Sequence, residues 1–456
     1  MHQDLLNFET LSVNEKARSS LFTEDWCIRE NGTKISFQQH RRDVHALAAT
    51  LPDNARFALN LCQDRYHFLV AFVAVALKRQ TNLLPPNRAL GVQRELIQQY
   101  PNCYILCDAP LADVPEAPVF EVKLPGKKIN RAISSPDIGI PRDHLAAILF
   151  TSGTSGKPVA VHKCWKELEA EVQLTAARFG LNRIGKRHLV ATVPPQHMFG
   201  LANSIMLPLV CNVGFISNRP FFPEDIRLAL KATPGGAVLV TTPIHLKACI
   251  NSGLNWIDCD CSLIISATAP LSQKLAASAE EQFGVPVKEI YGSTETGAIA
   301  SRRTTDGDEW LFYSGISAQP NADGYVVSGG HLINPCRMSD HLQVRSDGRF
   351  RLLGRHSDMI KLAGKRASLF ELNQKLNQID GVIDGSFIDP AAPGRETRRL
   401  AAIVVAPGMS RKELQNALAE WIDPVFLPRP LLFVDALPRN ETGKLTQQAL
   451  RALLKS

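Results

Sequence analysis

A repeated alternation of short apolar runs with helix-like segments, between about residue 140 and residue 292, restricts the fold of this chain more than any other feature. The strand-like runs are 145–150, 188–193, 237–242, 263–267 and 285–292. One helix-like segment precedes the third run, and another, at 271–283, follows the fourth. Short apolar runs that alternate with helices are typical of βαβ units and largely parallel sheets. We therefore predict an α/β fold.

The character of the sequence changes after Gly354, where a polar, charged and Gly-flanked stretch would suit a hinge. Helix-like segments at 369–376 and 411–421 then alternate with strand-like segments at 399–407 and 430–436. This tail of about 100 residues is large enough to fold on its own. We predict a large N-terminal domain of βαβ subdomains over residues 1–355, and a small α+β domain over residues 356–456.

The composition is that of a globular protein of 456 residues, with 45% hydrophobic residues and a formal net charge of +7. No dense run of Lys and Arg with interleaved aromatic residues is present, so nucleic-acid binding is not expected. The most apolar run, 68–77, is too short to cross a bilayer and is predicted to be a buried helix. Ten cysteines without a CxxC pair, and a polar N-terminus unlike a signal peptide, indicate a reduced, cytoplasmic protein without a membrane span.

A loop rich in Thr, Ser and Gly follows the first strand-like run and carries the strongest local signal. Its residues are Thr151, Ser152, Gly153, Thr154, Ser155, Gly156, Lys157 and Pro158. Glycines let the backbone approach phosphate oxygens, and hydroxyl and backbone N–H groups donate hydrogen bonds to them. A Walker loop would need glycine at the first position and Ser or Thr at the last, so this loop is not one. The pattern indicates a phosphate-binding loop, with an ordinary flexible Ser/Gly loop as the alternative.

A second polar loop follows the last strand-like run. Its residues are Tyr291, Gly292, Ser293, Thr294, Glu295 and Thr296. Ligands of α/β sheets bind beyond the carboxyl ends of the strands. A carboxylate at that place, Glu295, suits a Mg²⁺ ion that bridges phosphate groups. A capped turn with a solvated glutamate is the alternative.

Three further groups gain meaning only from their order along the chain. Asp340 could accept hydrogen bonds from two ribose hydroxyls, and Arg355 could add donors. Lys444, just past a Gly turn near the C-terminus, could project as a point charge. His197 lies in another loop after a strand-like run. Taken alone, each of these would be a surface charge or a structural histidine.

In order and spacing, these segments resemble the motifs of the adenylate-forming superfamily of acyl-CoA and aryl-CoA synthetases, stand-alone adenylation domains and firefly luciferase. The resemblance covers about residues 20–450 and includes SATAPLS at 266–272, YGSTET at 291–296 and PRNETGKL at 438–445. It implies an AMP-binding N-terminal domain, and a mobile C-terminal lid domain that carries the catalytic lysine. It also implies ATP and Mg²⁺ as cofactors.

The resemblance implies roles in a first half-reaction, in which a substrate carboxylate attacks the α-phosphorus of ATP and pyrophosphate leaves. Residues 151–157 would bind the phosphates, Glu295 would hold Mg²⁺, and Thr294 would contact the α-phosphate or the carboxylate. Asp340 and Arg355 would bind the ribose, and Lys444 would reach the α-phosphate from the lid. Further nucleotide contacts would come from Ala267, Thr268, Ala269, Pro270, Tyr291, Gly292 and Ser293.

The resemblance also implies a second half-reaction, in which a thiol attacks the acyl-AMP. In the family the small domain rotates about a hinge residue between the two steps, and Asp358 occupies that position. Lys444 would then leave the site and segment 359–366 would enter it. Gly364 would lie beside a pantetheine channel because it lacks a side chain. His197 would lie near the carboxylate and could gate the acyl pocket.

Three departures from the family pattern bear on phosphate binding and on the middle of the chain. Val159 stands where the family usually has a lysine after the proline of the phosphate loop. The family's Gly-Glu motif is not recognisable between Trp310 and Ser339, and its Thr-Gly-Asp is Met-Ser-Asp here. The residues that the chemistry needs most, Glu295, Asp340 and Lys444, are retained.

The expected reaction joins a small carboxylic acid to a thiol. Amino-acid-activating members place an Asp in the His197 loop, and because this chain has none there we expect an aryl or fatty acid. The expected acceptor is CoA or the phosphopantetheine of an acyl carrier protein. The alternatives are an amino-acid-activating enzyme and, because of Val159, a non-catalytic nucleotide-binding homologue. A luciferase-like oxygenase has no positive sign, and a phosphate-loop GTPase or ATPase lacks its Walker pattern.

Overall fold

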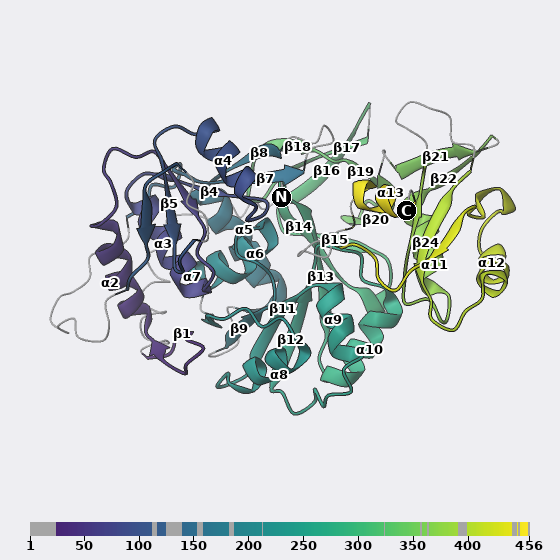
Figure 1. Ribbon diagram of the computed structural model, residues 1–456, viewed down its shortest axis with the longest axis horizontal. Helices are drawn as coiled ribbons and strands as arrows, with labels where there is room; N and C mark the ends of the chain where they lie inside the picture. The colour runs from purple at the N-terminus through teal and green to yellow at the C-terminus, as the bar shows by residue number, and fades with distance from the viewer. Residues whose placement is uncertain are drawn as a thin grey trace.

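The protein was analysed as a computed structural model, which describes most of the chain. The described residues are 24–111, 116–124, 139–152, 158–181, 187–211, 213–322, 324–355, 358–362, 364–390, 399–439, 445 and 447–454. They form five sheets with helices packed against them (Figure 1). The predicted α/β fold with parallel sheets is confirmed.

The largest sheet has eleven strands in the order β19-β20-β15-β14-β13-β12-β11-β9-β10-β1-β2. Its centre is parallel and consists of β9 (His188–Ala191), β11 (Ala237–Thr241), β12 (Cys261–Ser266) and β13 (Val287–Ser293). One flank is antiparallel and consists of β14 (Gly297–Arg303), β15 (Trp310–Phe312), β20 (Arg349–Arg355) and β19 (Asp340–Val344). The other flank consists of β10 (Gly214–Ile216), β1 (Cys27–Ile28) and β2 (Lys34–Ile35). The central strands are the apolar runs that the sequence predicts.

The second sheet has six strands in the order β6-β5-β3-β4-β7-β8. Its parallel strands are β3 (Phe57–Asn60), β4 (Thr81–Leu84), β5 (Cys103–Cys107), β6 (Val119–Glu121) and β7 (Leu145–Ser152). The last strand, β8 (Pro158–Cys164), turns back and pairs antiparallel with β7. The two strands therefore flank residues 153–157 of the predicted phosphate loop, which lie outside the described residues.

Helix α3 (Arg65–Leu77) forms the centre of the main core. Asp64 caps its first turn by accepting a hydrogen bond from the backbone N–H of His67 at 3.0 Å. Its side chains are apolar almost all round, as expected of a helix that is buried on every side, and those of 68–76 are fully buried. The cluster around α3 includes Leu149 of the six-stranded sheet and Val240 of the eleven-stranded sheet, so one core joins the two. The predicted buried helix is confirmed.

The remaining helices of the first 355 residues connect or cover the strands. They are α2 (Phe37–Ala48), α4 (Leu90–Gln99), α5 (Trp165–Phe179), α6 (Met198–Leu201), α7 (Leu207–Val210), α8 (Pro223–Lys231), α9 (Pro243–Ile250) and α10 (Gln273–Phe283). Helix α10 begins later than predicted because Ser272 caps it, accepting a hydrogen bond from the backbone N–H of Leu275. Leu271 therefore precedes the helix. No helix of the described chain has the length and apolar character needed to cross a membrane.

The chain after residue 358 forms a compact group of elements at one end of the molecule, drawn in yellow-green in Figure 1. They are β21 (Met359–Leu362), β22 (Lys365–Ser368), α11 (Leu369–Gln378), β23 (Asp384–Ile388), β24 (Ala401–Val405), α12 (Arg411–Ala419), β25 (Leu431–Phe433) and α13 (Gln447–Leu453). These elements, except α13, share a hydrophobic cluster of their own, which runs from Ile360 to Phe433. Lys274 of α10 forms an ion pair with Asp380 at 2.6 Å, which links the group to the rest of the molecule. The domain boundary between 355 and 356 remains a prediction.

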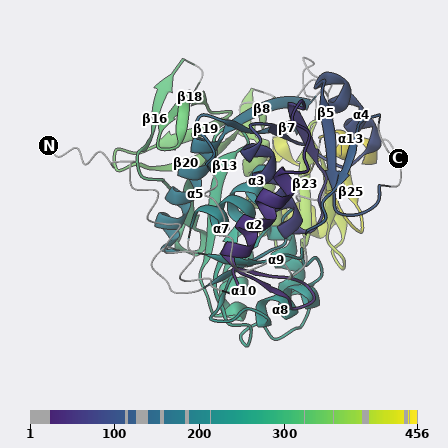
Figure 2. The same cartoon turned by 90° about the vertical axis from the view of Figure 1, so that its left-hand side faces the viewer.

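One region that the sequence left unassigned is a small antiparallel sheet. It consists of β16 (Ile316–Asn321), β17 (Gly324–Gly329) and β18 (Leu332–Arg337). This sheet lies at the periphery of the molecule (Figure 2). The turn before β18 reaches inward, and its His331 is buried.

Candidate active site

Three of the loops predicted to carry chemistry follow parallel strands of the eleven-stranded sheet. Strands β9, β11, β12 and β13 run in the same direction, so their carboxyl ends share one edge. The loop after β9 carries His197, the loop after β12 carries 267–270, and the loop after β13 carries Thr294 and Glu295. The fold therefore gathers three of the sequence-predicted groups at one edge.

The Glu295 loop is a tight hairpin between β13 and β14. The buried hydroxyl of Thr296 accepts a hydrogen bond from the backbone N–H of Ser293 at 3.0 Å and donates one to the carbonyl of Gly297 at 2.9 Å. Gly297 has a left-handed backbone (φ +64°), which closes the turn. Thr294 is half-buried and Glu295 is exposed. Among the described residues, the Glu295 carboxylate has no hydrogen-bond or ion-pair partner, so it remains available to a ligand.

Three buried side chains that the sequence reasoning missed hold the backbone of this hairpin. Lys163 of β8 donates to the carbonyl of Glu295 at 2.7 Å. The ring Nε2 of His331 lies 2.6 Å from the carbonyl of Thr296, and Glu171 of α5 accepts from the backbone N–H of Ala298 at 2.8 Å. Burial raises the pKa of Glu171 to about 7, which the Lys163 charge opposes. Burial lowers the pKa of His331 to about 4, so the ring is neutral.

The predicted ribose ligand, Asp340, lies beside the tyrosine of the second polar loop. The hydroxyl of Tyr291 donates a hydrogen bond to Asp340 Oδ2. The ring of Tyr291 packs against Trp310 and Phe350, with ring centroids 5.4 and 5.7 Å apart, which sets its direction. Asp340 begins β19 and is paired in register with Arg355 at the end of β20. The side chain of Arg355 lies outside the described part.

The segment 266–272, which is predicted to contact the nucleotide, is held by a buried ion pair. Glu289 accepts from the backbone N–H of Leu271 at 3.1 Å and from Arg302 Nε at 2.7 Å. Burial raises the pKa of Glu289, and the Arg302 charge opposes that shift. Within the segment, Thr268 has φ +79°, a left-handed conformation that is rare for a β-branched residue. Backbone strain of this kind gathers at ligand sites.

His197 begins the helical stretch after β9. It is half-buried and precedes α6, which continues through a π-helical turn (Ala202–Met206) into α7. Single π-helical turns within α-helices are frequent at functional sites. A Cβ atom at Gly200 would lie 1.9 Å from the carbonyl oxygen of Pro194, so only glycine lets α6 approach its own loop this closely.

The other predicted residues lie at the margins of the described chain. Thr151 is half-buried and pairs with Val159 across the β7–β8 hairpin, and Ser152 pairs with Pro158. Gly364 occupies the exposed turn between β21 and β22 with φ +82°, and Asp358 precedes β21. The remaining residues, Gly153, Thr154, Ser155, Gly156, Lys157 and Lys444, lie outside the described residues.

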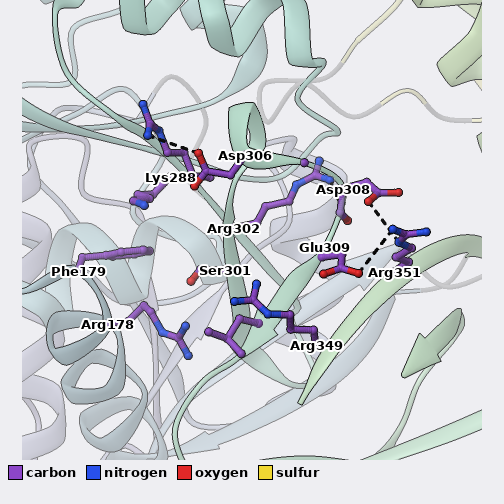
Figure 3. A pocket seen from close by; sticks show the side chains of 13 residues that line it. Arg178, Phe179, Lys288, Ser301, Arg302, Asp306, Asp308, Glu309, Arg349 and Arg351 are labelled. Carbon is purple, nitrogen blue, oxygen red and sulfur yellow. Dashed lines mark hydrogen bonds and ion pairs between the residues drawn. The ribbon is translucent and has the colours of Figure 1, made fainter. Parts of the chain in front are cut away.

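A pocket of about 540 Å³ lies at the opposite ends of β13 and β14 and is not part of this site (Figure 3). Lys288, at the start of β13, lines the pocket. It lies five residues from Ser293, roughly 17 Å along the strand. Several of the lining charges are already paired. The pairs are Arg302 with Glu289, Arg303 with Glu280, and Arg351 with Asp308.

Comparison with known proteins identifies the family. A family model described as AMP-binding enzyme matches residues 92–331. The 4-coumarate–CoA ligase of Halorhodospira halophila is 26% identical over 315 residues, which cover 66% of this chain and 75% of that protein. A 4-coumarate–CoA ligase-like protein of Arabidopsis thaliana is 24% identical, over 70% of this chain and 63% of that protein.

Solved structures show the same fold over almost the whole chain. ATP-bound MatB from Rhodopseudomonas palustris superposes with a TM-score of 0.77 at 20% identity, covering 97% of this chain and 99% of that chain. The o-succinylbenzoate CoA synthetase MenE from Bacillus subtilis, in complex with ATP and magnesium ion, has a TM-score of 0.77 at 18% identity, covering 97% and 98%. Since the family model spans more than half of the sequence, this chain belongs to the AMP-binding enzyme family.

Proposed function

We propose that this protein activates a carboxylic acid with ATP and transfers the acyl group to a pantetheine thiol. In the first step the acid carboxylate attacks the α-phosphorus, an acyl-AMP forms and pyrophosphate leaves. In the second step a thiolate attacks the acyl carbon and AMP leaves. The observation that carries this proposal is the contact of Asp340 with Tyr291 of the second polar loop, the loop that also carries the exposed Glu295, in a chain of the AMP-binding family.

Nucleotide binding is assigned to the loops after β12 and β13, to the β19–β20 pair and to the loop after β7. Asp340 accepts hydrogen bonds from the ribose hydroxyls, with Arg355 as an added donor. The segment formed by Ala267, Thr268, Ala269 and Pro270 lies against the adenine. The loop 151–157 donates to the phosphates through hydroxyl and backbone N–H groups. These contacts place the α-phosphorus beyond the end of β13, near Thr294, which contacts the α-phosphate or the substrate carboxylate.

The residues at the hairpin fit a magnesium ion. Mg²⁺ usually keeps several waters and takes one or two carboxylates together with substrate phosphates, so a cage of protein ligands is not needed. The described residues contain no group of three or more His, Cys, Asp or Glu that could hold a metal. A single exposed carboxylate, Glu295, is the kind of donor that Mg²⁺ takes together with substrate phosphates. Bound there, the ion would neutralise charge on the phosphates.

The C-terminal part of the chain supplies the mobile groups. We assign residues 1–355 to an AMP-binding domain and 356–456 to a lid, with the hinge at Asp358. Lys444 brings its charge to the α-phosphate in the first step. A preorganised charge of this kind stabilises the charge that develops in the transition state. After rotation, the β21–β22 turn approaches the site, and Gly364 leaves space for pantetheine.

The substrate assigned here is an aryl or fatty acid. The loop around His197 offers no carboxylate for a substrate ammonium group, and the side chains next to it, Met198 and Phe199, are apolar. The names of several similar proteins, among them the 4-chlorobenzoate–CoA ligase of Arthrobacter, also refer to aryl acids. His197 gates the acyl pocket. The acceptor is CoA or an acyl carrier protein.

The test is acid-dependent release of AMP from ATP. Benzoate, 4-coumarate and octanoate are offered in turn with CoA or a holo-acyl carrier protein, for the wild type, Lys444→Ala and, as a control, Lys412→Ala on the exposed face of α12. AMP that requires one class of acid, and that falls at least 100-fold only in Lys444→Ala, supports the proposal. Normal activity of Lys444→Ala contradicts the role of Lys444. No AMP with any acid favours a non-catalytic nucleotide-binding protein.

A further inference from the structure

The most unusual buried group near the site is Lys163. It is 1% exposed, although lysine is among the residues least often buried. Its ammonium group donates to the carbonyl of Glu295 at 2.7 Å and lies 4.0 Å from the carboxylate of Glu167. Glu167 in turn accepts from the backbone N–H of Cys164 at 3.0 Å. The Lys163 ammonium group therefore lies between the Glu167 carboxylate and the backbone carbonyl of the hairpin.

The hairpin is held at two further points. The carbonyl of Thr296 faces His331, and the N–H of Ala298 faces Glu171. Glu171 is itself buried, and the Lys163 charge acts on it. Side chains from β8, from the turn before β18 and from α5 thus hold the hairpin backbone at three residues, Glu295, Thr296 and Ala298. Of the three contacts, the one made by Lys163 is to Glu295 itself, the residue that we assign to the metal.

We propose that Lys163 is a positioning residue for Mg²⁺ binding, which sets the direction of the Glu295 carboxylate by holding the Glu295 carbonyl. This inference rests on the proposed function, since it takes Glu295 as the metal ligand. Mg²⁺ requires nearly ideal octahedral geometry with ligands at 2.0–2.1 Å in general. A backbone rotation at Glu295 would move its carboxylate by more than that geometry tolerates. The lysine acts through Glu295 and does not touch the nucleotide.

The test measures the affinity for ATP by calorimetry, once with excess Mg²⁺ and once with EDTA. Lys163→Met keeps an unbranched, apolar stem for the buried position but removes the charge and the donor. We expect it to raise the Kd for ATP about tenfold with Mg²⁺ and less than about twofold with EDTA. Lys163→Arg keeps a charged donor, and its Kd is expected to lie between those of the wild type and Lys163→Met.

Two further variants separate the possible outcomes. Glu295→Gln should raise the Kd with Mg²⁺, and adding Lys163→Met to it should cause no further loss, because the lysine acts through that carboxylate. Tyr104→Phe removes a buried hydrogen bond of 2.7 Å to Gln80, far from the hairpin, and should change neither Kd. An equal loss with and without Mg²⁺, an additive double variant, or an unchanged Kd in every Lys163 variant that folds would overturn the proposal. No effect of Glu295→Gln would instead refute the assigned metal ligand.

Discussion

Replacement of Gly297 by alanine should destabilise the protein by more than a left-handed backbone alone explains. Gly297 has φ +64°, and a non-glycine residue in that region costs about 1 kcal/mol. A Cβ atom there would also lie 2.4 Å from Glu171 Oε2, so the buried carboxylate must move. Above its pKa of about 7 the Glu171 carboxyl is ionised, and the loss of its hydrogen bond to the N–H of Ala298 then costs about 2 kcal/mol, as for a bond to a charged group. The expected loss is therefore about 3 kcal/mol.

The matched control is Gly180→Ala at the end of α5. Gly180 has φ +70°, and no atom lies within 4 Å of a Cβ built there, so only the backbone cost of about 1 kcal/mol applies. Urea unfolding followed by tryptophan fluorescence gives the free energy of unfolding for both variants. Equal losses, within about 0.5 kcal/mol, would show that Glu171 does not restrict the hairpin and would refute the reasoning.

Three other predictions concern buried or site-lining polar groups. The pKa of Glu171 is raised from 4.5 to about 7, so the folded state binds the proton more tightly, and the free energy of unfolding should fall as the pH rises from 4.5 to 7. Glu171→Gln should remove about 3 kcal/mol of that fall in urea titrations at several pH values, and unchanged curves would contradict this. Tyr291→Phe removes the donor to Asp340 and should raise the KM for ATP about fivefold without changing the KM for the acid; an unchanged value would mean that Asp340 needs no support. Arg65→Met leaves two backbone carbonyls near the end of β9 without their donor and should cost about 3 kcal/mol in urea unfolding, against the wild type.

Much of the fold could be predicted because the buried strands are short, apolar and bounded by loop residues. The runs at β7, β11 and β12 have this form, and each is buried in the structure. The sheet β16–β18 could not be predicted, because most of its residues are exposed or half-buried and two of its strands, β17 and β18, carry no alternation of apolar and polar side chains. Runs of apolar residues indicate buried strands only, so they do not predict strands at the periphery of the molecule.

The candidate site was predictable in its loops and not in its supports. The loops carry Gly, Ser and Thr next to a strand, a local signal. The contacts that hold them join distant positions, such as Lys163 with Glu295 and Tyr291 with Asp340. Of these supporting residues, only Glu171 could have been suspected from the local sequence. It shares the buried face of α5 with Leu168 and Thr175, and a carboxylate buried there needs a partner.

The last prediction concerns Val159, which stands where the family usually has a lysine, and compares a lysine at 159 with Lys163. Val159 and Lys163 are four residues apart in β8, so they lie on the same face of the strand, yet Val159 is 50% exposed and Lys163 is buried. A lysine at 159 would meet the phosphates as a solvated charge, while Lys163 acts only through the metal ligand. Val159→Lys should therefore lower the Kd for ATP in EDTA about fivefold at low salt, and much less at 0.5 M salt, where about 1 kcal/mol of exposed attraction is screened. If Val159→Lys lowers the Kd for ATP only when Mg²⁺ is present, a lysine at 159 also acts through the metal, and the reasoning is wrong.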